Sequence, residues 1–288
     1  MPNPKDATLD AKLIEIRAGL LSLGEYEPTD AAPAQIRFLL KRFEGQDHFL
    51  AKDMADGLHI SGQTYASWME TKGPPTINDS SEAKERMIEL FEGRGRELAA
   101  QLGYEVRITA SEYPLSNAPV AVLVSRGGPV HGNQAISSSY DTLQYIKSLD
   151  IAAGDAILDK FNADTAPNGH FAYLLRRYVN DDYANAHVLL TKAGLPNVSN
   201  LVGMWKENRN LPSVEKQKRI ADYLKKSIAD RKFRADKELG FGIDLAISRH
   251  RNPNSPLGFG QETAQIFQLD DYRKARGDKP NPGPQYAK

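Results

Sequence analysis

The residue types that most often carry catalysis or bind metals are scattered along this sequence of 288 residues. Cysteine is absent, which excludes disulfides, thiolate nucleophiles and cysteine metal ligands together. The six histidines include no pair four residues apart beside a carboxylate, a common spacing of helical metal ligands. The glycine-rich stretch 127–132 lacks the lysine and hydroxyl of a phosphate-binding loop. The acidic pairs 181–182 and 270–271 favour helix caps over acid–base catalysis. We therefore expect no enzyme, no metal site and no cofactor.

A more informative feature is a set of three short strings that occurs twice in the same order. The strings are Phe-Leu-Leu-Lys-Arg-Phe at 38–43 and Tyr-Leu-Leu-Arg-Arg-Tyr at 173–178, Trp-x-Glu-x-basic-x-x-Pro from Trp68 and again from Trp205, and Leu-Gly-aromatic at 102–104 and 239–241. The first pair is offset by 135 residues and the other two by 137, so about two residues of loop differ. Three anchors in one order predict an internal duplication, and a duplication sets the domain count.

Hydrophobic periodicity places helices and short strands around these anchors. In the first copy we expect helices near 8–23, 35–44, 47–57, 62–71 and 81–102, the last starting at Ser80 or Ser81, and strands at 104–109 and 120–124. In the second copy we expect helices near 153–162, 170–179, 183–194, 199–207 and 213–237, and a strand at 241–248. The fold class is therefore mainly α with small β elements.

The duplication divides the chain into two units of similar size. The first unit covers 9–125 and the second 151–258, each a set of helices followed by a short strand or hairpin. Residues 126–150 form a linker that contains a helix near 139–149. Residues 259–288 hold a basic helix and a Pro-rich tail that we expect to be disordered. The β elements could pair with each other or with a second chain.

Composition and charge are those of a soluble globular protein, with 40% hydrophobic and 26% charged residues. No apolar run approaches the length of a membrane span, and the N-terminus lacks the pattern of a signal peptide. With the absence of cysteine, this favours the cytoplasm. Net charge is zero, but residues 1–150 carry 15 basic and 21 acidic groups, whereas residues 151–288 carry 22 and 16. The basic second half is the half better suited to phosphate.

Residues 49–75 resemble the helix-turn-helix of the XRE family, the lambda-repressor type of DNA-binding domain. The matching features are a first helix with Leu50, Ala51, Met54 and Ala55 on an apolar stripe, a turn, Ser61, a second helix that ends in Trp68-Met69-Glu70, and Pro75. The second copy, at 188–212, departs more from the pattern, because Val198 occupies the position of Ser61. Neither copy has the family's Gly-Lys pair in order; Thr71-Lys72 and Asn208-Arg209 stand there.

The resemblance implies that the second helix of each motif lies in the major groove of DNA. In the first unit, Ser61 would cap this helix, Tyr65 and Trp68 would be buried, and Gln63, Thr64 and Ser67 would face base edges. In the second unit, Asn197 or Ser199 would cap the helix, and Ser199, Asn200 and Gly203 would face outward, with Trp205 in the core. Candidate phosphate contacts, which position a protein without reading sequence, are Lys72, Arg209, Lys216, Lys218 and Arg219. The same basic run continues with Lys225, Lys226, Arg231, Lys232 and Arg234, which could also contact phosphates. Arg42 and Arg177 are expected on the surface, where phosphate contacts are open to them.

The sequence therefore predicts a transcriptional regulator that binds a bipartite site on double-stranded DNA, alone or as a homodimer, and not a membrane. Two alternatives remain. A replication or partition protein of a mobile element would use the same motifs on arrays of repeats. A protein-interaction scaffold would have helix-turn-helix units that no longer touch DNA, and the neutral total charge favours this reading.

Overall fold

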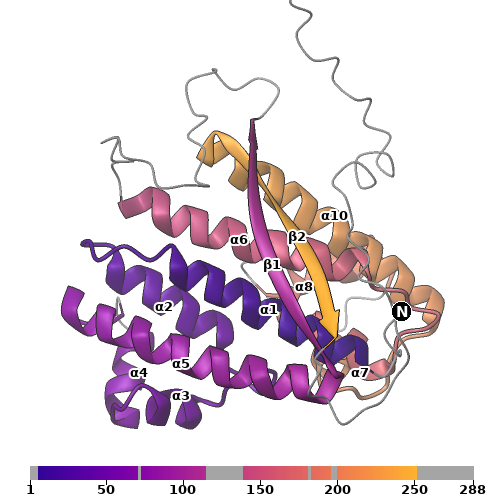
Figure 1. Ribbon diagram of the computed structural model, residues 1–288. Helices are drawn as coiled ribbons and strands as arrows, with labels where there is room; N and C mark the ends of the chain where they lie inside the picture. Colours follow the sequence, from indigo (N-terminus) through magenta and orange to yellow (C-terminus); the bar gives the residue numbers. More distant parts are fainter. Residues whose placement is uncertain (1–5, 71–72, 115–138, 181–182, 196–199, 252–288) are drawn as a thin grey trace, which may run out of the picture.

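The computed structural model describes residues 6–70, 73–114, 139–180, 183–195 and 200–251 (Figure 1). This part of the chain is mainly helical, with a small two-stranded antiparallel sheet. The fold class expected from the sequence is confirmed at this level. The strand expected at 120–124, and the helix and tail expected beyond 258, lie outside the described residues.

The order of elements in the first half returns in the second half. The first half contains α1 (Ala7–Gly24), α2 (Ala32–Phe43), α3 (Ala51–Gly57), α4 (Gly62–Glu70), α5 (Ile77–Leu102) and β1 (Tyr104–Pro114). The second half contains α6 (Ser139–Asp159), α7 (Asn168–Tyr178), α8 (Ala186–Lys192), α9 (Leu201–Lys206), α10 (Val214–Leu239) and β2 (Phe241–Arg251). Helices α5 and α10 both have 26 residues, and both strands have 11.

Local signals explain how the long helices begin and end. Gly103 and Gly240 follow α5 and α10 in the left-handed conformation, with φ of 75° and 82°, which glycine adopts without steric cost. Helix α5 begins earlier than expected, because Thr76 rather than Ser80 or Ser81 caps it and accepts a hydrogen bond from the Asp79 N–H at 3.1 Å. The helices expected separately near 139–149 and 153–162 are the single helix α6.

The first helices of the two halves, α1 and α6, pack against each other at the centre, and α5 and α10 cover them from opposite sides (Figure 1). One continuous core runs through both halves and includes Leu13 and Phe91 from the first half and Ile157 and Leu224 from the second. The aromatic anchors Trp68 and Trp205 are buried, as expected. Burial of this apolar surface is the main favourable contribution to the stability of such a fold.

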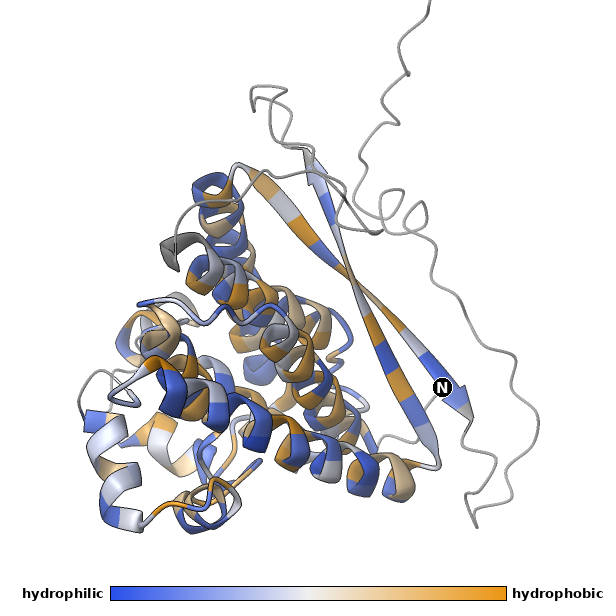
Figure 2. Cartoon of the chain, turned by 60° about the vertical axis from the view of Figure 1, so that its left-hand side comes forward, coloured by the Kyte–Doolittle hydropathy of each residue, from blue (hydrophilic) through white to orange (hydrophobic). Residues whose placement is uncertain are grey.

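The two strands pair with each other along their whole length. They form a long twisted ribbon beside the helices, and hydrophobic and hydrophilic residues alternate along it (Figure 2). Val106 and Ile243 are buried on the helix-facing side, whereas Arg107 and Ala246 are exposed. Thr109 pairs with Ala246, which is its own equivalent at the offset of 137. A residue that pairs with its equivalent lies on a twofold axis, so the ribbon is arranged as in an isologous dimer.

Candidate nucleic-acid interface

Helices α3 and α4 form a small lobe at one end of the molecule (Figure 1). A short turn joins them, and in it His59 adopts a positive φ of 58° while the Ile60 N–H donates to the Ala55 carbonyl at 3.1 Å. Met54 and Ala55 on α3 are buried, as the apolar stripe requires. Leu50 and Ala51 were expected on the same stripe, and this expectation is wrong: Leu50 precedes the helix with 56% of its surface exposed, and Ala51 begins the helix and is exposed.

The start of α4 is capped as the sequence predicts. The Ser61 hydroxyl oxygen accepts a hydrogen bond from the Thr64 N–H at 3.0 Å, and the two hydroxyl oxygens are 2.8 Å apart. An exposed serine cap of this kind stabilises a helix by about 1 kcal/mol. The cap therefore fixes the direction in which α4 leaves the turn.

The two faces of α4 differ sharply in burial. Tyr65 and Trp68 are buried, and the Tyr65 hydroxyl donates to Glu44 at 3.1 Å. Burial, followed by the charge of Glu44, raises the pKa of Tyr65, which therefore stays protonated. Gln63, Thr64 and Ser67 are exposed on the opposite face. The structure thus brings four of the predicted contact residues, Ser61 included, to one solvent-facing row.

The α8–α9 pair of the second half is shorter. Asn185 caps α8 by accepting hydrogen bonds from the His187 and Val188 N–H groups, and the C-terminal Gly194 has a positive φ of 67°, the equivalent of His59. Asn200 lies at the start of α9 and is exposed. A Cβ added at the exposed Gly203 would meet nothing within 4 Å, so no other part of the described chain approaches it closely.

The basic candidates of the second half lie on exposed surface. Lys216, Lys218 and Arg219 are in the first turns of α10, and Arg209 lies in the connection that precedes it. Lys218 forms an ion pair with Asp164 at 2.8 Å, Arg219 with Glu215 at 2.6 Å, and Arg209 with Glu207. Exposed pairs of this kind contribute about 0–1 kcal/mol, so phosphate could replace the carboxylates at little cost. Lys72, Asn197 and Ser199 lie outside the described residues.

Sequence reasoning misplaced the two arginines of the repeated segment. Arg42 and Arg177, expected on the surface, are buried at 8% and 7% exposure. Arg42 donates to Asp150 at 2.6 Å and to Glu15 at 3.0 Å, and Arg177 lies 2.8 Å from Glu15. We call Glu15, Arg42, Asp150 and Arg177 the central ion cluster. The signal that could have found it is the presence of acidic residues inside the apolar periodicity of α1 and α6.

The contacts within the central ion cluster are reciprocal. Arg42 donates to the carbonyl oxygen of Arg177 at 3.4 Å, and Arg177 donates to the carbonyl oxygen of Arg42 at 2.6 Å. Arg42 and Arg177 are equivalents at the offset of 135, as are Glu15 and Asp150. The same approximate twofold axis therefore relates the helices and the strand ribbon.

Burial and charge oppose each other in this cluster. Burial alone would raise the pKa of Glu15, but Arg177, Arg42 and His48 together hold it well below its ordinary value. His48 lies 2.6 Å from Glu15, and burial, with the nearby charge of Arg177, lowers its pKa to about 4. A neutral His48 must then donate from Nε2 to the Glu15 carboxylate. The cluster holds the two halves together.

No group of three or more histidine and carboxylate side chains among the described residues is placed to hold a metal ion. Among the described helices, none has the length and apolar content needed to cross a bilayer.

Comparison of the chain with models of known protein families, with curated proteins and with solved structures found no match. Any function therefore has to be argued from the site itself.

Proposed function

We propose that this protein is a transcriptional regulator that binds a bipartite site on double-stranded DNA with two helix-turn-helix units, α3–α4 and α8–α9. The observation that carries the proposal is the exposed row Ser61, Gln63, Thr64 and Ser67 on α4, opposite the buried Tyr65 and Trp68. A capped helix that buries aromatics on one side and presents amide and hydroxyl groups on the other is suited to the major groove. Glutamine pairs with adenine, and threonine contacts thymine methyl groups.

The reciprocal contacts between the halves support the bipartite site. Repressors with one motif dimerise so that two recognition helices meet successive turns of the duplex. Here the approximate twofold axis seen in the ribbon and in the central ion cluster would relate the two motifs within one chain. Because α4 and α9 carry different exposed side chains, the two half-sites would differ in sequence.

Phosphate contacts would come mainly from the second half. Helix α10 contains nine basic and five acidic residues, whereas α5, its equivalent, contains four basic and six acidic residues. Lys216, Lys218 and Arg219 stand at the exposed start of α10. Neutralisation of phosphates supplies much of the affinity of such proteins for DNA.

The same charge contrast favours a second candidate function, a protein-interaction scaffold. Between Gly62 and Glu70, α4 contains no lysine or arginine, and its single charged residue is Glu70. Asp79 and Glu82 of α5 stand where α10 has Lys216 and Arg219. An acidic surround repels phosphate, so the first motif would then contact a protein.

The test is selection of bound fragments from random double-stranded DNA by the purified chain at about 0.15 M salt, because affinity depends steeply on salt. We expect a two-part consensus, and we expect Gln63→Ala to relax one half only. The matched control is Gln101→Ala, an exposed glutamine at the end of α5. If no sequence is enriched, and if Gln63→Ala and Lys225→Ala leave DNA binding unchanged, the protein-interaction scaffold becomes the better interpretation.

A further inference from the structure

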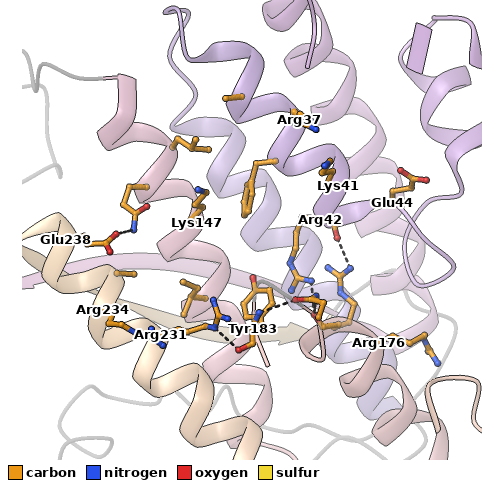
Figure 3. Close-up of a pocket in the computed structure, with 18 residues that line it drawn as sticks. Arg37, Lys41, Arg42, Glu44, Lys147, Arg176, Tyr183, Arg231, Arg234 and Glu238 are labelled. Atoms are coloured by element: carbon orange, nitrogen blue, oxygen red, sulfur yellow. Dashed lines mark hydrogen bonds between the residues drawn. The ribbon is translucent and has the colours of Figure 1, made fainter. Parts of the chain in front are cut away.

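A cleft of about 860 Å³ opens between α2, α6, α7 and α10, where the two halves meet (Figure 3). Eight of the side chains that line it are lysine or arginine, and two are carboxylates, Glu44 and Glu238. The row on α4 is not part of this lining. The cleft is thus a second concentration of functional groups, apart from the row on α4, and it shares Arg231 and Arg234 with the basic run of α10.

Three of the eight cations are already neutralised. Arg42 and Arg177 belong to the central ion cluster at the inner side of the cleft. Arg176 donates to both carboxylate oxygens of Asp47 at 2.7 and 2.8 Å. Even so, Nη2 of the buried Arg177 has no hydrogen-bond partner among the described residues. An orphaned, buried donor of this kind costs free energy unless something accepts from it.

Four of the other five cations form no ion pair within the described part of the chain, namely Arg37, Lys41, Lys147 and Arg234. Arg37 donates to the carbonyls of Met69 and Glu70, Arg231 to that of Tyr183, and Arg234 to that of Asp230. Figure 3 shows these cations on facing helices around one space.

The carboxylates do not balance this charge. Glu44 accepts a hydrogen bond from Tyr65, and Glu238 accepts one from Gln144 at 2.7 Å. Asp182, the sequence equivalent of Asp47, lies outside the described residues. Within the described lining, the four cations without an ion pair outnumber the two carboxylates Glu44 and Glu238 by two.

At the equivalent position on the other side of the approximate twofold axis, the corresponding residues are more deeply buried or already paired. There, Tyr173 is fully buried, whereas its equivalent Phe38 is only half-buried on the wall of the cleft. Ala172 replaces Arg37, and Lys12, the equivalent of Lys147, pairs with Asp47 at 3.2 Å. The open, cationic cleft is therefore a departure from the symmetry of the fold and not a consequence of it.

We propose that this cleft binds a small molecule that carries a polyphosphate, either inorganic polyphosphate or a nucleoside polyphosphate. Its volume lies in the range of small-ligand sites, of about 300–1,000 Å³. Guanidinium groups match the geometry of phosphate oxygens and bind them through paired hydrogen bonds. Phe38 and Ile151 supply an apolar wall for an organic group. The cleft does not include the exposed row on α4, so a small ligand and not the duplex proposed above is its expected occupant.

Calorimetric titration of the full chain at about 0.1 M salt tests this, with inorganic triphosphate, ATP and adenosine as probes. We expect triphosphate and ATP to bind and adenosine to remain silent. The double variant Lys41→Gln/Arg234→Gln should bind both phosphates at least tenfold more weakly. The matched control Lys216→Gln/Lys218→Gln removes two charges from exposed α10 surface outside the cleft and should change affinity less than twofold.

The source of the polyphosphate is decided by the ratio of the two affinities: tighter binding of ATP assigns a nucleotide, and equal binding assigns the inorganic polymer. Lys41 and Arg234 are exposed, so the unfolding midpoint without ligand should stay unchanged. Lys147→Gln, on α6, provides a second variant, which should weaken the binding of both triphosphate and ATP. Absence of binding at millimolar probe, or equal weakening in the α10 control, would overturn the proposal. The proposal would also be overturned if neither phosphate probe binds and Lys41→Gln/Arg234→Gln lowers the affinity for double-stranded DNA.

Discussion

At the residue scale, the unusual feature of this protein is a set of charges buried between its halves. Burying ions is costly, and a well-packed apolar cluster of the same volume is often at least as stable. Charged pairs differ from apolar contacts in requiring one orientation: Arg42 must meet Asp150 and Glu15 at hydrogen-bond distance. The cluster therefore favours one relative placement of the halves. Apolar packing alone would specify that placement less strictly.

The pH dependence of stability should report on His48, which contacts Glu15 of this cluster. Burial lowers its folded-state pKa to about 4, whereas the unfolded chain binds a proton at this histidine below about pH 6.5. Between these two pH values only the unfolded chain is protonated there. This contribution to stability is present above pH 6.5 and is lost as the pH falls towards 4. We expect His48 to account for a loss of about 1–2 kcal/mol between pH 7 and pH 5, measured by urea unfolding.

His48→Gln keeps a donor for Glu15 but does not fill the imidazole's place, so the variant should be less stable at pH 7. Because glutamine does not titrate, the variant should lose less stability than the parent protein between pH 7 and pH 5. His170, whose pKa burial also lowers to about 4, remains in the variant and leaves a residual slope. His187→Gln, at an exposed position on α8, serves as the control and should leave the slope unchanged. An unchanged slope in His48→Gln would contradict the assignment of the neutral state to His48.

At the scale of elements, the sequence predicts most of the architecture because the signals are local. Apolar periodicity indicates α1, α2, α5 and α10, and the glycines after the long helices mark their ends. The break expected inside α6 does not exist. The small residues Ala152, Ala153 and Gly154 at that point do not form a turn. They lie buried where neighbouring helices approach closely.

Close approach explains a conserved spacing between the two halves, the glycine pair Gly19 and Gly154 at the offset of 135. A Cβ at Gly19 would lie 2.6 Å from Phe91 and 2.7 Å from Phe43, and a Cβ at Gly154 would lie 2.8 Å from Tyr178. Gly19→Ala should therefore lower the free energy of unfolding by about 1–3 kcal/mol. Urea unfolding at constant pH measures the change.

The control is Gly93→Ala in α5, where an added Cβ would meet nothing within 4 Å. Alanine has the higher helix propensity, so this variant should gain about 0.5–1 kcal/mol. The two substitutions are chemically identical, but their expected effects on the free energy of unfolding are opposite in sign. If both stabilise the protein, α1 does not pack against Phe43 and Phe91 as described.

At the scale of the whole molecule, the two halves share one core and one sheet. Leu13, Phe91, Ile157 and Leu224 belong to the same cluster of buried residues, and β1 pairs only with β2 among the described strands. Interfaces between independent domains are usually more polar and less continuous. We therefore expect the halves to unfold in one transition although they repeat in sequence.

The two tryptophans make this testable, because the chain has one in each half. Trp205→Phe leaves Trp68 as a fluorescence probe of the first half, and Trp68→Phe leaves Trp205 for the second. Met87→Ala and Leu224→Ala, at equivalent fully buried positions, should each lower the stability of both halves by about 2–5 kcal/mol. Separate midpoints for the two probes, or a shift confined to the substituted half, would show that the halves are independent.

The sequence by itself determined the order of most helices, the cap at Ser61 and the polarity of α4, because each depends on residues within a few turns of one another. Only the tertiary structure decided that β1 pairs with β2, that Arg42 and Arg177 are buried, and that Lys41 and Arg234 border one cleft. These features join residues that are more than 100 positions apart. Local periodicity shows which face of a helix is apolar, but not which partner covers it, nor which charges that partner brings.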